Sequence, residues 1–214
     1  MLTDDSRRTW ITCLTGQDRR TITSFPRTQR DGFIVVVDHK GARIVADGIN
    51  YPNEARLDST GRWLYTNETT AGRLLRYPVG ADAVLGRPEV VWEFDESNML
   101  DGFALDSEGG IWMTALVSNR LWYLSPSGDL RLLLEEYDRG HLEQLVQEQK
   151  TAGVTRALLY QDHGNRLANI SSIAFGGPDL KTVYLGSLMG TRLHSFRSPI
   201  AGARPAHWNY GPFG

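Results

Sequence analysis

Short runs in which apolar and polar residues nearly alternate recur along the chain, and turn residues separate them. Examples are Val90-Val-Trp-Glu-Phe94 and Arg120-Leu-Trp-Tyr-Leu124. Near-alternation over about five residues predicts β-strands with one buried face. The same pattern predicts further strands at residues 32–37, 42–46, 73–77, 130–134 and 192–196. The chain is therefore predicted to be an all-β protein.

The predicted strands belong to a repeat, which is clearest between Asp101 and Trp112. In that copy a leading polar residue is followed by an apolar stretch, by Asp-Ser-Glu-Gly and then by the aromatic residue. Residues 53–65 and 171–184 follow a similar plan. Repeats of this kind indicate supersecondary units that bury their apolar faces only by stacking against one another.

A fourth, shortened copy stands at the beginning of the chain. Asp4 and Trp10 have the same spacing as Asp106 and Trp112. Counting back from Asp4 to the leading polar residue of the copy gives a position two residues before Met1. This arithmetic predicts that the leading residue of the first copy is missing.

Four short strands in a unit of roughly 50 residues are typical of a β-propeller blade. We therefore predict a single β-propeller domain over residues 1–214, with about four blade equivalents and an N-terminal truncation. A ring that does not close leaves strand edges exposed. Self-association through these open edges is expected.

The distance between copies predicts one insertion. Asn53 and Asp101 lie 48 residues apart, whereas Asp101 and Ser171 lie 70 residues apart. The excess falls in residues 135–165, where apolar residues spaced three and four apart predict a short amphipathic helix. We interpret the segment as an insertion packed on one rim of the propeller. A lid over a functional site is the alternative.

The leading polar residues of the copies are the first candidates for chemistry. If Asn53, Asp101 and Ser171 begin the innermost strands of successive blades, they project into one shared channel. Amide and carboxylate oxygens suit Ca²⁺, Mg²⁺ or Mn²⁺ better than Zn²⁺. The alternative is that these residues only cap strand ends. His163, just before the third complete copy, is a candidate substrate contact at the mouth of the channel.

Composition excludes several classes of partner. The net charge is -2, with 22% charged residues, and no basic stripe suited to nucleic acid or an anionic membrane is present. The longest apolar runs are too short to span a bilayer, and no apolar signal segment follows Met1. Cys13 is the one cysteine, so an intramolecular disulfide is excluded. From these features we expect a cytoplasmic protein.

Four motifs together resemble successive blades of the SMP-30/gluconolactonase family. They are residues 51–55, 63–69, 100–112 and 174–184. The resemblance implies a six-bladed propeller with a divalent cation, usually Ca²⁺, in the central channel. It also implies hydrolysis of a lactone or a related ester.

The resemblance implies roles for individual residues. Asn53 and Asp101 match metal ligands of the family, and Asp101 is also the expected general base. Ser171 is expected near the substrate. Glu54 stands where the family has Gly, and Leu100 stands where it has Pro. The Glu ligand that the family carries in its first blade, and an Asn near the start of a later blade, find no counterpart here.

The expected function is therefore metal-dependent hydrolysis of a small-molecule sugar lactone or related ester. Weak metal binding and little activity are expected of the chain if it is truncated. Two alternatives stay open at this stage. One is a non-catalytic propeller that serves as a binding or scaffold surface, and the other is an enzyme similar to strictosidine synthase.

Overall fold

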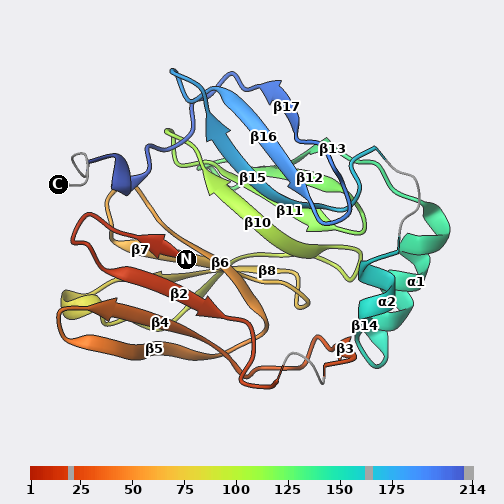
Figure 1. Cartoon of the computed structure of the whole chain (residues 1–214), viewed down its shortest axis with the longest axis horizontal. Helices are drawn as coiled ribbons and strands as arrows, with labels where there is room; N and C mark the ends of the chain where they lie inside the picture. Colours follow the sequence, from red (N-terminus) through yellow and green to blue (C-terminus); the bar gives the residue numbers. More distant parts are fainter. Residues whose placement is uncertain (19–21, 162–165, 210–214) are drawn as a thin grey trace.

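The protein is described by a computed structural model that covers residues 1–18, 22–161 and 166–209. Strands dominate it and form four larger antiparallel sheets and one two-stranded sheet. Figure 1 shows how these strands are arranged. Sheet 1 consists of β1 (Leu2–Thr3), β2 (Thr9–Cys13), β4 (Gly32–Asp38) and β5 (Gly41–Ile49). Sheet 2 consists of β6 (Pro52–Leu57), β7 (Trp63–Glu68), β8 (Arg73–Pro78) and β9 (Glu89–Glu93).

Two further sheets follow in chain order. Sheet 3 consists of β10 (Met99–Leu105), β11 (Ile111–Leu116), β12 (Arg120–Leu124) and β13 (Leu130–Leu134). Sheet 4 consists of β15 (Ile170–Gly176), β16 (Thr182–Ser187) and β17 (His194–Arg197). The described part of sheet 4 thus has three strands, where the repeat predicted four. The predicted fold class, an all-β protein built from propeller blades, is confirmed.

The segment between sheets 3 and 4 contains the helices. α1 spans Arg139–Lys150 and α2 spans Arg156–Leu159. Between them, β14 (Val154–Thr155) pairs with β3 (Ser24–Phe25), and this connects the segment to the loop that follows β2. Figure 1 shows both helices beside this strand pair at one side of the molecule. None of the helices in the described residues is long and apolar enough to cross a membrane.

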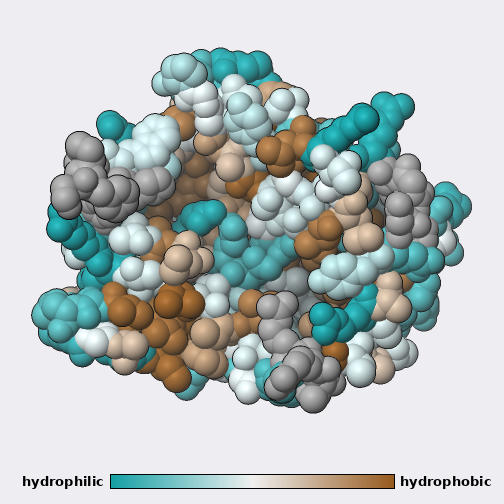
Figure 2. Space-filling view, in the orientation of Figure 1, coloured by the Kyte–Doolittle hydropathy of each residue, from teal (hydrophilic) through white to brown (hydrophobic). Residues whose placement is uncertain are grey.

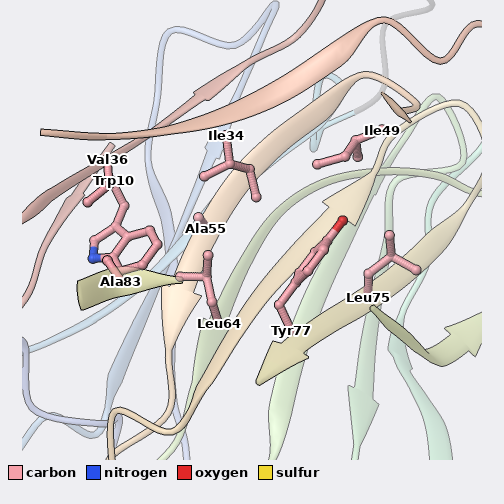
Figure 3. Packing of buried hydrophobic residues seen from close by; sticks show 9 residues of the cluster. All are labelled: Trp10, Ile34, Val36, Ile49, Ala55, Leu64, Leu75, Tyr77 and Ala83. Atoms are coloured by element: carbon pink, nitrogen blue, oxygen red, sulfur yellow. The ribbon is translucent and has the colours of Figure 1, made fainter. Parts of the chain in front are cut away.

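The core between sheets 1 and 2 follows from the alternation of β4. Ile34 and Val36 point to one side of β4 and are fully buried. There they pack with Trp10 of β2 and Leu64 of β7 (Figure 3). By burying the facing sides of both sheets, this cluster stacks them as adjacent blades.

The shortened first copy has the same turn as the complete one. Asp106 accepts hydrogen bonds from Trp112 Nε1 at 3.0 Å and from the Gly110 amide at 2.7 Å. Asp4 likewise accepts from Trp10 Nε1 at 2.9 Å, and from the Arg8 amide at 2.9 Å. The sequence alignment of these two turns is therefore confirmed. In both, a buried aspartate fixes the turn and the tryptophan that follows it.

In the part of the chain that the structure describes, the four larger sheets stack in chain order and do not close into a ring. β2 contacts β6, β6 contacts β10, and β10 contacts β15. Figure 2 shows apolar residues gathered on one face over sheet 1. Sheet 4 and the loop between β16 and β17 carry exposed large apolar residues as well, namely Tyr184, Leu188, Met189, Leu193 and Phe196. Self-association through such surfaces stays a prediction.

Candidate functional site

Each inner strand is irregular at its leading polar residue. The pairing register shifts between Pro52 and Ala55 in β6, between Leu100 and Phe103 in β10, and between Ile170 and Ser172 in β15. Residues within such β-bulges leave the regular alternation of the strand, so their side chains are re-aimed. The three candidate positions of the repeat therefore lie in three equivalent irregularities.

Asn53 and Asp101 are in direct contact. The Asn53 amide Nδ2 donates a hydrogen bond to Asp101 Oδ1, which joins sheets 2 and 3. Asp101 is only 7% exposed, while Asn53 is partly buried. The backbone carbonyl oxygen of Asn53 accepts a hydrogen bond from the Thr12 hydroxyl of β2 at 2.5 Å. The structure thus brings together the two residues that the sequence singled out as ligands.

The backbone of Ser171 lies close to Gly102, the residue that follows Asp101. A Cβ added to Gly102 would stand 2.7 Å from the Ser171 carbonyl oxygen. A glycine after Asp101 is therefore what allows β10 and β15 to approach so closely. The Ser171 side chain is partly buried. His163, the other predicted substrate contact, lies outside the described residues.

Asn67 is a site residue that the sequence analysis did not identify. It is the last residue but one of β7 and is 1% exposed. Its Nδ2 donates to the Asp101 carbonyl oxygen at 2.5 Å, and its Oδ1 accepts from the Glu54 amide at 3.0 Å. Asn67 therefore supplies hydrogen-bond partners for one backbone group in each bulge. In this way it connects β6 of sheet 2 to β10 of sheet 3. A buried asparagine inside a strand was the available signal, because strands are depleted in asparagine.

Replacing Asn67 by alanine should reduce the free energy of unfolding by about 2 kcal/mol. The reason is that a buried N–H and a buried C=O each lose their partner. Urea unfolding of Asn67→Ala and wild type at one pH measures the loss. Asn98→Ala is the matched control. Asn98 is also buried, but its Oδ1 accepts a hydrogen bond from Trp122 Nε1 and not from a site residue. Addition of divalent cation should stabilise Asn98→Ala like wild type and Asn67→Ala less, and equal stabilisation would contradict a role in the site.

Glu54 adds a second carboxylate beside Asp101. Its Oε2 accepts from the Phe103 amide at 3.1 Å and pairs with the Arg56 guanidinium at 3.1 Å. Burial, with a further contribution from the charge of Glu54, raises the pKa of Asp101 to about 7, and the hydrogen bond from Asn53 opposes this rise. The carboxyl groups of Glu54 and Asp101 thus lie close enough, where β6 meets β10, for the charge of one to affect the pKa of the other.

Other polar candidates are accounted for by structural contacts. Glu68 is the last residue of β7 and is 2% exposed. Its oxygens accept from the Asn50 amide at 2.8 Å and from Arg73 Nε at 2.6 Å. His141 is buried in α1 and its Nε2 contacts the Leu158 carbonyl oxygen at 3.0 Å. The contacts of Glu68 and His141 are therefore structural.

The donor set at Asn53 and Asp101 is compatible with a hard divalent cation. Asp101 is a buried carboxylate whose side chain accepts a hydrogen bond from the neutral amide of Asn53, and its neighbour Glu54 is a second carboxylate. A buried carboxylate of this kind is stabilised by a cation. Oxygen donors favour Ca²⁺, Mg²⁺ or Mn²⁺. Within the described residues, no group of three His, Cys, Asp or Glu side chains is close enough to hold a metal.

Stacked antiparallel blades, with polar residues in the bulges of their inner strands, define a protein of the β-propeller class. Residues 1–137 match the SMP-30/Gluconolactonase/LRE-like region, and the chain belongs to this family. The resemblance found in the sequence is thereby confirmed.

Two curated proteins are similar to this chain. A 6-deoxy-6-sulfogluconolactonase of Pseudomonas putida is 28% identical over 166 residues, which cover 76% of this chain and 47% of that protein. YvrE of Bacillus subtilis (strain 168), named as a candidate sugar lactone lactonase, is 23% identical over 93% of this chain and 57% of its own length. The chain thus spans about half the length of the curated relatives it matches.

A solved structure supports the fold. The calcium-binding protein regucalcin of Agrobacterium tumefaciens superposes with a TM-score of 0.61 at 18% identity. The superposition covers 94% of this chain and 60% of the regucalcin chain. At this level of identity the similarity concerns the arrangement of the blades.

Proposed function

We propose that this protein hydrolyses a sugar lactone or a related ester at the Asn53–Asp101 pair, with a divalent cation such as Ca²⁺, Mg²⁺ or Mn²⁺. The observation that carries the proposal is the contact between these two side chains across the β6 and β10 bulges, with Asp101 buried. Support comes from relatives whose names contain lactonase and from a calcium-binding protein of the same fold.

Each residue has a defined task in this proposal. Asp101 and Asn53 would hold the cation, and a bound cation would polarise the lactone carbonyl and stabilise negative charge on its oxygen. The second oxygen of Asp101 accepts a proton from the attacking water. Asn67 keeps Asp101 in place through its backbone carbonyl, and Ser171 is assigned to the substrate.

Cation binding should be visible as increased stability. A ligand that binds only the folded protein raises the free energy of unfolding, by about 2.7 kcal/mol at a hundredfold excess over its dissociation constant. We expect Ca²⁺, Mg²⁺ or Mn²⁺ to raise the melting temperature of wild type, and to have little effect on Asp101→Asn. Thermal scans with each cation make the measurement. Stoichiometric stabilisation by Zn²⁺ with no response to the other cations would overturn the oxygen-donor site.

A panel of aldonolactones and simple esters, assayed with each cation and with a chelator, tests the reaction itself. Hydrolysis that requires the cation supports the proposal. Cation binding without hydrolysis of any lactone or ester would instead favour the binding-surface alternative.

A further inference from the structure

Glu54 lies on the same side of β6 as Asn53. In a regular strand, consecutive side chains point to opposite faces. Here the bulge between Pro52 and Ala55 interrupts that alternation. Asn53 contacts the Asp101 side chain, while Glu54 Oε2 accepts from the Phe103 amide two residues further along β10. Both side chains therefore reach toward the same strand of the next sheet.

The carboxylate of Glu54 is held by the adjacent arginine. Arg56 NH2 lies 3.1 Å from Glu54 Oε2, and the two side chains are 34% and 25% exposed. Partly exposed ion pairs of this kind contribute little net stability, so they exchange partners at small cost. Arg56 is thus a positive charge beside Glu54, whose own charge acts on Asp101.

We propose that Glu54 is a further oxygen donor of the cation site, and that Arg56 holds its carboxylate until a divalent cation displaces the guanidinium. This inference rests on the proposed function, because it assumes that Asn53 and Asp101 bind a cation. It adds the carboxylate of Glu54 to that pair of ligands. It also makes the Arg56 guanidinium a competitor of the cation for this carboxylate.

The charges of the three side chains explain why the exchange is favourable. The negative charges of Glu54 and Asp101 repel each other, and the positive charge of Arg56 compensates that of Glu54. A divalent cation between the carboxylates compensates both and requires no long side chain to be ordered. Removal of Arg56 should therefore strengthen cation binding, and only through Glu54.

A double-mutant cycle on the full chain tests this dependence. Calorimetric titration with CaCl₂, MgCl₂ and MnCl₂ at fixed ionic strength compares wild type, Glu54→Gln, Arg56→Gln and the double variant. Arg56→Gln should bind the preferred cation on the order of tenfold tighter, and Glu54→Gln on the order of tenfold weaker. The double variant should bind like Glu54→Gln, because Arg56 acts through that carboxylate.

Arg76→Gln is the matched control. Arg76 forms an exposed pair with Glu89 at 2.7 Å on the same sheet, so its removal changes the net charge by the same amount away from the site. Its cation affinity should equal that of wild type. A tightening equal to that of Arg56→Gln would reduce the effect to net charge and overturn the proposal.

The outcomes separate this inference from the proposed function. If Asp101→Asn loses cation binding while Glu54→Gln keeps it, the role of Glu54 is wrong and the Asn53–Asp101 site survives. A gain in Arg56→Gln that persists without Glu54 also overturns the competitor role. If wild type binds none of the three cations at millimolar concentration, both the cation site and the role of Glu54 are wrong.

Discussion

Asp101→Asn should be more stable than wild type at pH 8 in the presence of a chelator, by on the order of 4 kcal/mol. The pKa of Asp101 is raised from 3.8 to about 7, first by burial and then by the charge of Glu54. Asparagine has the shape of the protonated acid without its ionisation. The variant therefore avoids the cost of a charge that the folded protein holds unfavourably.

The pH dependence follows from proton binding in the two states. Below about pH 4 the carboxyl group is protonated in both the folded and the unfolded chain, so it contributes no difference. Between about pH 4 and 7 the unfolded chain releases the proton while the folded chain keeps it. The stability of wild type therefore falls as pH rises through this window, and above pH 7 the penalty is constant. The advantage of Asp101→Asn should grow over the same window.

Urea unfolding at a series of pH values measures this difference. Asp106→Asn is the control, because Asp106 is also buried but accepts hydrogen bonds from Trp112 and from the backbone of its own turn. It should lose stability at pH 8 where Asp101→Asn gains it. Adding the preferred cation should remove most of the gain, since the cation stabilises the ionised carboxylate. An Asp101→Asn protein less stable than wild type at pH 8 would show that the carboxylate is already neutralised.

The fold could be predicted because its signals are local and repeated. Asp4 and Trp10 have the same spacing as Asp106 and Trp112, and the two turns have equivalent hydrogen bonds. Alternation gave strands such as Arg120–Leu124 and Leu130–Leu134 with the bounds that the structure has. Sheet 4 differs in its number of strands because the segment after β17 does not pair as a fourth strand in the described residues.

The site was predictable only in part. Position in the repeat singled out Asn53 and Asp101, which the structure joins by a hydrogen bond. The bulges were not predicted, because the apolar pattern fixes which face a residue occupies but not where the ladder slips. For the same reason, neither Asn67 nor Glu54 was predicted to be a site residue. Their partners lie on β10, so their roles depend on how two blades meet rather than on their own strand.

The largest effect on chemistry is expected from Asp101→Asn. In the proposed reaction this change keeps one oxygen donor but removes the charge that holds the cation and the base that accepts the proton. Turnover of the best lactone should fall by on the order of a hundredfold or more. Asp106→Asn should stay within a few-fold of wild type where it is folded, because its contacts support the turn.

Measured together, stability and turnover distinguish a catalytic carboxylate from a structural one. A buried charge kept for function costs stability, so its removal should give a protein that is more stable and less active. Assays at saturating cation and lactone, with circular dichroism to show intact folding, provide both values for each variant. If Asp101→Asn and Asp106→Asn lose turnover equally while both stay folded, the carboxylate of Asp101 has no special part in the reaction. If Asp101→Asn is more stable than wild type but has the same turnover, the reaction takes place in another part of the propeller.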